Sequence, residues 1–511
     1  MADQQEFFDH ITNGYTTKGD SITLGAAMLG GETITNALVK VPLKTLNRHG
    51  LIAGATGTGK TKTLQVLAEN LSEKGIPVLL MDMKGDLSGI AQPSPGHAKI
   101  DERHEKIGIP FNAQKFPVEI LTLSEQQGVR LRATVSEFGP VLISRILNVS
   151  ETQAGIISVL FKYCDDNKLP LLDLKDFKKI LQFSTGDGKA EIAEQYGRIS
   201  PASSGAILRK IVELEQQGGD LFFGEKSFDT DDLLRVNDNG MGYINIVRLT
   251  DIQDRPKLFS TFMLCMLAEI YSTFPEQGDS GRPELVIFID EAHLIFKEAS
   301  DALLDQIESI VKLIRSKGVG LYFVTQNPTD VPDAVLSQLG LKIQHALRAF
   351  TAKDRKAIKL TAENYPISEY YKTDEVLTSL GIGEALVSVL NEKGIPTPLA
   401  ATLLRAPMSR MDILTDDELK DLLADSKLIK EYNEAIDRES AYELLNKKIE
   451  IAHKEEAKEK AEKEKAATKR ASSRRSTSSR SRSSGKSALE KVLSSPTVIR
   501  SVLGILSKLI K

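Results

Sequence analysis

The sequence predicts an α/β protein whose core is a mainly parallel sheet covered by helices. Short apolar runs of strand length alternate with longer segments of helical spacing, which is the pattern of parallel strands joined by crossover helices. The chain has 511 residues, of which 41% are hydrophobic, so it can bury a large core. This length indicates two or three domains.

Six apolar runs are the expected strands of the sheet. The first run precedes residues 60–74, where Leu64, Leu67, Ala68 and Leu71 have helical spacing. Two later runs, EALVSVL and TPLAATLL, flank the turn NEKGIP and predict a terminal hairpin. The six strand candidates are LIAGA (51–55), IPVLLMDM (76–83), MGYINIVRL (241–249), ELVIFIDEAH (284–293), GLYFVTQNP (320–328) and LKIQHALRAF (341–350).

Changes in pattern and composition divide the chain into seven segments. Between the second and third strand candidates, the sequence carries several helical periods and few strand signals. Past residue 450 it becomes charged, which indicates helix or coil, and then rich in Ser and Arg, which predicts disorder. We expect a small β-rich N-terminal module (1–46), the first part of the core (47–140), a helical insertion (141–235), the second part of the core (236–410), C-terminal helices (411–452), a charged and then Ser/Arg-rich disordered linker (453–487), and an amphipathic C-terminal helix (488–511).

The overall composition points to the cytoplasm and does not require a nucleic-acid partner. The formal net charge is −4, so any basic site must be local. The two cysteines, Cys164 and Cys265, lie far apart, which argues against a disulfide framework and fits a reducing compartment. The N-terminus has no signal-peptide pattern, and no run of about 18 apolar residues predicts a spanning helix.

The segment GATGTGKT lies between the first strand candidate and its helix. It matches G-x-x-x-x-G-K-[ST], the loop whose main-chain N–H groups hold a phosphate chain at a helix N-terminus. Glycines allow the backbone to approach the phosphates, the lysine reaches the β- and γ-phosphates, and the threonine hydroxyl holds Mg²⁺. The expected binding residues for ATP are Gly54, Ala55, Thr56, Gly57, Thr58, Gly59, Lys60, Thr61 and Lys62.

An acidic pair ends the strand LVIFI. In an open α/β sheet, side chains at the carboxyl ends of strands meet the ligand. Asp290 is therefore expected to hold Mg²⁺ together with Thr61, and Glu291 to act as the general base toward the attacking water. The sequence has no [NT]-K-x-D guanine motif, which leaves ATP as the expected nucleotide.

Two further polar groups follow strand candidates. Thr325, Gln326 and Asn327 end a buried strand, and Gln326 is the candidate that senses the γ-phosphate or orients water. Asp82 and Lys84 end the strand that we expect beside the strand of the phosphate loop. By position they could contact the nucleotide or Mg²⁺-bound water, or stabilise the turn.

With these motifs in this order, the chain resembles the HerA–FtsK superfamily of P-loop motor ATPases, and within it the bacterial HerA-like YjgR family. The residues that carry the resemblance are NRHGLIAGATGTGKT, VLLMDMKGDLSGI, LVIFIDEAHLIF and IRSKGVGLYFVTQNPTDVP. The resemblance covers about residues 1–450. It implies a P-loop NTPase fold with a RecA-like core and an ATPase that works as a ring, with six subunits expected and ATP at the subunit interfaces.

The resemblance also implies an arginine from a neighbouring subunit at each site. Arg315 in IRSKGVG matches the position of the family's arginine finger, which gives it a catalytic role beside Lys60, Gln326 and Glu291. Arg48 matches a second arginine found near the nucleotide in HerA proteins. Both could instead be surface arginines.

These features leave three functions open. The first is a ring ATPase that acts on DNA as a translocase or helicase-like enzyme, and the second is a P-loop ATPase that remodels a protein or membrane partner without DNA translocation. The third is a nucleotide-dependent switch that hydrolyses slowly. The clearest basic cluster is the Ser/Arg segment, which could bind phosphate backbones, serve as a linker, or contact anionic lipid together with the final helix.

Overall fold

The computed structural model describes residues 2–278, 280–297, 301–349, 351–434, 436 and 438–475. By its internal contacts the chain divides into two units, residues 1–445 and 446–511. The first unit contains the sheet and the helices that cover it. In the second unit the structure describes residues 446–475, which continue a helix that begins at Ala441.

A twelve-stranded sheet organises the first unit, in the order β2-β1-β12-β11-β10-β3-β9-β8-β4-β7-β5-β6. All neighbouring pairs from β10 to β6 in this order are parallel, and the pairs from β2 to β10 are antiparallel. The strands are β1 Ser21–Leu29, β2 Glu32–Pro42, β3 Gly50–Ala53, β4 Val78–Asp82, β5 Val118–Thr122, β6 Val129–Arg130, β7 Ile244–Arg248, β8 Leu285–Ile289, β9 Val319–Thr325, β10 Leu341–His345, β11 Glu384–Ser388 and β12 Ala400–Leu404.

The central strands are continuous apolar runs because both of their faces are covered. All residues of β3, β4, β8 and β9 are buried. The helices are α1 Ala2–Gly14, α2 Lys60–Glu73, α3 Ala98–Ile107, α4 Val135–Ile146, α5 Glu151–Asp166, α6 Leu174–Thr185, α7 Lys189–Gln195, α8 Pro201–Gln216, α9 Gly219–Phe222, α10 Pro256–Thr273, α11 His293–Lys297, α12 Asp301–Leu313, α13 Asp333–Leu336, α14 Ala352–Glu363, α15 Thr373–Ser379, α16 Asp416–Ala424, α17 Lys427–Tyr432 and α18 Ala441–Arg475.

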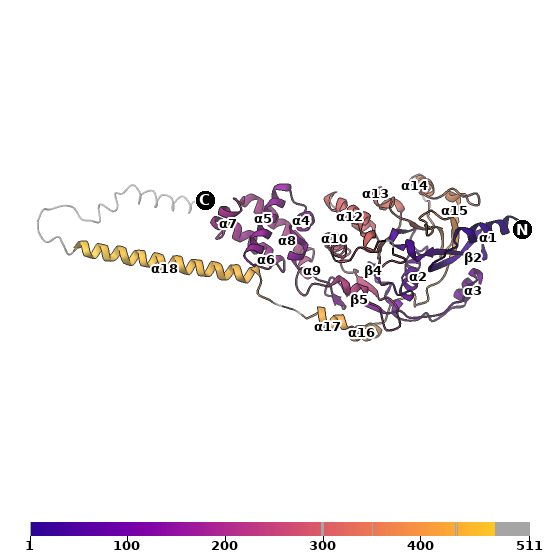
Figure 1. Ribbon diagram of the computed structural model, residues 1–511, viewed down its shortest axis with the longest axis horizontal. Coiled ribbons are helices and arrows are strands. Elements are labelled where there is room, and N and C mark those ends of the chain that lie inside the picture. Colours follow the sequence, from indigo (N-terminus) through magenta and orange to yellow (C-terminus); the bar gives the residue numbers. More distant parts are fainter. Residues whose placement is uncertain are drawn as a thin grey trace. The chain divides into compact units, whose positions relative to one another are not determined.

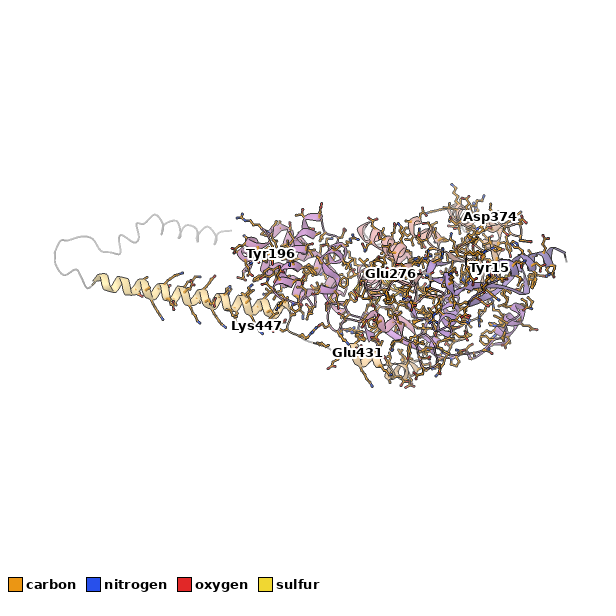
Figure 2. The ribbon with its side chains drawn as sticks, in the orientation of Figure 1. Tyr15, Tyr196, Glu276, Asp374, Glu431 and Lys447 are labelled. Carbon is orange, nitrogen blue, oxygen red and sulfur yellow. The ribbon has the colours of Figure 1, made fainter. Side chains whose placement is uncertain are left out.

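The helical insertion comprises α4 to α9, between β6 and β7 (Figure 1). Three of its helices begin at capping boxes, in which Thr134, Ser150 and Asp173 accept hydrogen bonds from main-chain N–H groups of the first turn. Figure 2 labels Tyr196 within this group, and its hydroxyl donates to Asp166 at 2.6 Å. Local capping signals therefore define the starts of these helices in a region without strand periodicity.

The six expected strands and the terminal hairpin of β11 and β12 are confirmed, but the expected neighbours are wrong. The sequence suggested that β4 lies beside β3, whereas β9 and β8 separate them. The acidic strand β8 is separated from β3 by β9. Strand order depends on long-range pairing, which the local pattern does not contain. The strands β5, which has five residues, and β6, which has only two, were not predicted from the sequence.

The N-terminal segment is not a separate β module. It begins with α1, and its two strands extend the core sheet because β1 pairs antiparallel with β12. Tyr15, labelled in Figure 2, fixes the end of α1 to the hairpin: its hydroxyl donates to the carbonyl of Pro398 at 2.7 Å. Where β1 pairs with β12, a Cβ on Gly25 would lie 1.9 Å from the carbonyl oxygen of Leu403, so only glycine fits.

The helix α18 corrects part of the predicted disordered linker. The linker was expected to start at 453, but α18 continues to Arg475, through charged residues and into the Ser/Arg-rich segment. Lys454 pairs with Glu450 and Lys463 with Glu459, each four residues apart, in a sequence rich in helix-forming Ala, Glu and Lys. The rest of the linker (476–487) and the amphipathic helix (488–511) lie outside the described residues. No helix within the described ranges is long and apolar enough to cross a bilayer.

Candidate nucleotide site

The loop between β3 and α2 has the backbone of a phosphate-binding loop. Gly54, Gly57 and Gly59 have φ values of 152°, 78° and 111°, which only glycine adopts without strain. The loop is tied to both neighbouring strands, because the Gly54 N–H donates to Thr325 at 3.3 Å and the Ala55 N–H donates to Ala346 at 2.9 Å. Its shape is therefore preorganised by the sheet.

Lys60 is the first residue of α2 and lies inside the loop. Only 7% of its surface is exposed, and its Nζ donates to the carbonyl oxygens of Gly54 at 2.7 Å and Ala55 at 3.1 Å. Burial lowers the Lys60 pKa, and repulsion from Lys84 adds to this, while Glu291 and Asp290 oppose it. The ammonium therefore shares one electrostatic environment with the acidic pair.

The other residues of the loop differ in burial and in the parts of the chain that they contact. Thr58 is buried, its hydroxyl donates to Ala55 at 2.7 Å, and its carbonyl accepts from the N–H of Gly383 at 3.0 Å. Thr56 is exposed and Thr61 is half-buried. Lys62 turns away from the loop and donates to the carbonyl of Met411, in the segment that follows β12.

Asp290 and Glu291 directly follow β8 and are 3% and 9% exposed. The N–H of Glu291 donates to Asp290 Oδ1 at 2.9 Å, and Glu291 itself has a positive φ of 48°. Burial raises the pKa of Asp290 to about 6, although the charge of Lys84 opposes the rise. This φ value marks local strain at the carboxyl edge of the sheet, a feature that clusters at functional sites.

Asp290 Oδ2 is buried and has no hydrogen-bond partner, whereas the buried Glu291 Oε2 has one nitrogen close to it. His293, the first residue of α11, has its Nδ1 3.2 Å from Glu291 Oε2, and Lys84 Nζ is 3.7 Å from Asp290 Oδ2. Buried carboxylate oxygens without donors are costly unless a ligand completes them. Asp290 with Thr61 has the hard oxygen donors that suit Mg²⁺.

Asp290 and Thr61 offer oxygen donors of the type that Mg²⁺ takes when it is shared with phosphate. Among the residues that the structure describes, there is no group of three or more His, Cys, Asp or Glu side chains that could hold a metal ion alone. Mg²⁺ usually takes one or two protein oxygens and completes its shell with water and phosphate oxygens. The donor set at Asp290 and Thr61 is of this kind.

Asp82 has a structural role in the turn after β4. Its carboxylate accepts the N–H groups of Lys84 at 3.2 Å, Gly85 at 2.7 Å and Leu87 at 3.3 Å. Lys84, in contrast, reaches across to the neighbouring strand β8, where its Nζ lies 2.7 Å from Glu291 Oε1. The sequence left both roles open for these residues, and the geometry separates them.

The polar residues after β9 also have different roles. The Thr325 hydroxyl donates to Asp330 at 2.7 Å, and Asn327 forms a capping box with the same aspartate at the turn 328–330. Gln326, between them, is exposed at the edge of the sheet where the phosphate loop and the acidic pair also lie. Its side chain, unlike those of Thr325 and Asn327, is not used in the turn at 328–330.

Arg48 and Arg315 lie at the opposite edge of the same sheet. Arg48 ends the turn before β3 and Arg315 lies in the turn before β9, whereas the phosphate loop follows β3. The two strands are parallel, and the six steps of β9 span about 20 Å at roughly 3.3 Å per residue. The structure therefore does not bring either arginine to the phosphate loop of its own chain.

His345 is a residue of the site that the sequence did not single out. It ends β10, is fully buried, and its Nε2 lies 2.9 Å from the hydroxyl of Thr63 on α2. A Cβ on Gly54 would lie 2.5 Å from the His345 Cβ. The polar residue at a buried strand end was a signal in the sequence, but the contact itself depends on the pairing of β10 with β3.

The solved structures share this fold. The conjugative coupling protein TrwB, in an unbound form, aligns with a TM-score of 0.52 and 15% identity, over 80% of this chain and 94% of that chain. The same protein in complex with ADP and Mg²⁺ aligns with a TM-score of 0.51 and 16% identity, over 78% of this chain and 98% of that chain. These likenesses establish the fold.

Curated relatives and a family model show to which family the sequence belongs. The DNA double-strand break repair helicase HerA of Sulfolobus acidocaldarius is 23% identical over 406 residues, which are 78% of this chain and 73% of that protein. A probable helicase of Methanocaldococcus jannaschii, MJ1565, is 26% identical over 371 residues, 70% of this chain and 63% of that protein. The model of the family described as helicase HerA-like C-terminal matches residues 28–511. Because this match covers nearly the whole chain, the protein belongs to the helicase HerA-like C-terminal family.

Proposed function

We propose that the protein is an ATP-hydrolysing ring motor that acts on DNA as a translocase or helicase-like enzyme. The observation that supports hydrolysis is the shared environment of Lys60, Asp290 and Glu291, in which Asp290 keeps one buried oxygen without a hydrogen-bond partner. The curated relatives are named as helicases, which supports DNA as the substrate. TrwB, a protein of the same fold, was solved with ADP and Mg²⁺, the ligand pair that we propose here.

Each residue has a defined task in the proposed reaction. Main-chain N–H groups of residues 57–61 hold the phosphates at the start of α2, and Lys60 exchanges its bonds to Gly54 and Ala55 for phosphate oxygens. Asp290 and Thr61 would be the protein ligands of Mg²⁺, which would neutralise charge on the phosphates.

The task of Glu291 is to activate the attacking water. Its buried carboxylate accepts the proton of the water, and His293 Nδ1, 3.2 Å from Oε2, lies beside it. Gln326, exposed at the same edge, orients the water or contacts the γ-phosphate.

The arginines support action between subunits. Since Arg315 and Arg48 lie at the amino edge of their own sheet, they can serve only a site in another subunit. A head-to-tail arrangement would place the amino edge of one subunit against the carboxyl edge of the next and would close as a ring, for which we propose six subunits. Arg315 is then the residue that neutralises the transferred phosphoryl group. A cytoplasmic location is part of this proposal, with Cys164 and Cys265 both free thiols.

The test is the rate of phosphate release with no addition, with double-stranded DNA, with single-stranded DNA, and with anionic liposomes. We expect double-stranded DNA to stimulate hydrolysis, and Lys60→Ala to show no hydrolysis under any condition. Stimulation by liposomes alone would favour a motor that remodels a protein or membrane partner. Absence of ATP hydrolysis by the wild type under all four conditions would overturn the proposal.

A further inference from the structure

The turn after β4 determines where the side chain of Lys84 lies. The turn after β4 is fixed by Asp82, which accepts three main-chain N–H groups. Because β4 pairs in parallel with β8, with Met81 opposite Ile289, Asp82 is level with Asp290. The side chain of Lys84 thus starts at the same sheet edge as the acidic pair and reaches it at the end of the neighbouring strand.

The Lys84 ammonium lies between the two acids. Its Nζ is 2.7 Å from Glu291 Oε1 and 3.7 Å from Asp290 Oδ2. The two carboxylates are buried, whereas 39% of the Lys84 side chain is exposed. An exposed, flexible lysine can leave such a pair at little cost in side-chain packing, which the buried Lys60 cannot do.

Charge makes this position incompatible with a second cation. Lys84 supplies one positive charge to two buried carboxylates, and it already repels Lys60. A divalent cation bound at Asp290 would place two further positive charges beside the ammonium, and like charges in a partly buried site disfavour each other. Lys84 and the divalent cation therefore compete for the same oxygens.

We propose that Lys84 is a latch: its ammonium occupies the Asp290–Glu291 pair in the nucleotide-free subunit and competes with Mg²⁺ for it, so that entry of the metal–nucleotide complex displaces Lys84. This inference rests on the proposed function. It assigns Lys84 a positioning role toward Glu291 in the empty site. It also explains why a buried acidic pair is tolerated there, because the pair is neutralised in part by a residue of the chain itself.

The test compares the full-length wild type with Lys84→Met and with the control Lys74→Met. Lys74 lies at the other end of α2, its side chain is also 39% exposed, and it forms an ion pair with Asp20 at 3.9 Å. Binding of a fluorescent ATP analogue is measured as a function of Mg²⁺ concentration and again in EDTA. Thermal melting confirms that each variant is folded.

The latch predicts that Lys84→Met strengthens nucleotide binding at limiting Mg²⁺ and weakens it in EDTA. The Mg²⁺ concentration at half-maximal nucleotide binding should fall by about 3- to 10-fold, which is the range for removing one half-exposed charge from a cation site. In EDTA, nucleotide binding should become weaker by about 2- to 5-fold, because one cation that faces the phosphates is lost. A purely structural lesion would weaken both, and Lys74→Met should change neither.

Two results separate this inference from the proposed function. Lys84→Arg keeps the charge, so its Mg²⁺ midpoint should stay near that of the wild type. An unchanged or higher midpoint in a folded Lys84→Met protein that still binds nucleotide would overturn the latch alone. Failure of the wild type to bind the analogue with or without Mg²⁺ would instead overturn the proposed function.

Discussion

Gly54 and His345 pack directly against each other, such that a Cβ at Gly54 would lie 2.5 Å from the His345 Cβ. Gly54 also has a φ of 152°. Gly54→Ala should therefore destabilise the first unit by about 3 kcal/mol or more, since it combines a disfavoured backbone with overpacking in a rigid site. Urea unfolding measures the change in free energy.

Gly57→Ala is the matched control for this prediction. Gly57 has a φ of 78°, but a Cβ there would meet no atom within 4 Å. Its cost should be limited to the backbone, about 1 kcal/mol. If the two variants lost equal stability, the contact with His345 would not contribute, and backbone conformation alone would explain the glycine at position 54.

The chemical step gives a second prediction. Lys60→Ala removes the ammonium that is buried in the loop, so nucleotide binding should be lost. Glu291→Gln keeps the shape of the side chain and removes its basicity, so binding should persist while turnover falls by about 10²- to 10⁴-fold. Analogue binding and phosphate release, measured on both variants, separate the two roles. Turnover at the wild-type rate in Glu291→Gln would rule out Glu291 as the base.

The sequence contained the parts of this site but not their arrangement. GATGTGKT and LVIFIDE could be predicted because each is a local pattern: an apolar run followed by the polar residues that its end presents. The order of β3, β9, β8 and β4 could not, since it depends on pairing between distant segments. The contact of Lys84 with Glu291 follows from that order, and so does the contact of His345 with Thr63.

The position of Arg315 relative to the phosphate loop follows from the topology of the sheet and not from a local sequence pattern. Arg315 precedes β9 and Lys60 follows β3, and in a parallel sheet these positions lie at opposite edges. That conclusion needs only the direction of two strands, so it could be drawn once both were known to be parallel. The neighbouring subunit that would bring the edges together is not encoded in any local pattern.

A third prediction concerns the separation of Arg315 from the phosphate loop of its own chain. Arg315→Ala should reduce ATP turnover on the order of 10³-fold, as expected for loss of an arginine that neutralises the phosphoryl group. Mixing it with Lys60→Ala subunits should restore activity, because about a quarter of random head-to-tail interfaces would then combine an intact loop with an intact arginine. Phosphate release is followed across mixing ratios. No recovery at any ratio would contradict action between subunits.

The last prediction concerns acid stability and His49, at the amino edge. His49 is buried; its Nδ1 accepts the N–H of Leu321 at 3.0 Å, and its Nε2 is 2.8 Å from the carbonyl oxygen of Val311. This pair of partners fits a neutral ring protonated at Nε2. Burial lowers the His49 pKa to about 4, the hydrogen bond to Val311 opposes this, and the charge of Arg315 adds to it.

Because the folded pKa lies below the unfolded value, the stabilising effect is fully present above pH 6.5 and is lost as the pH falls toward 4. A difference of about 2.5 units corresponds to about 3 kcal/mol at full effect. Urea unfolding between pH 8 and pH 4 should show this loss, and His49→Gln should be less stable at pH 8 but show a shallower decline. A variant that declines as steeply as the wild type would show that protonation of His49 does not drive the acid instability.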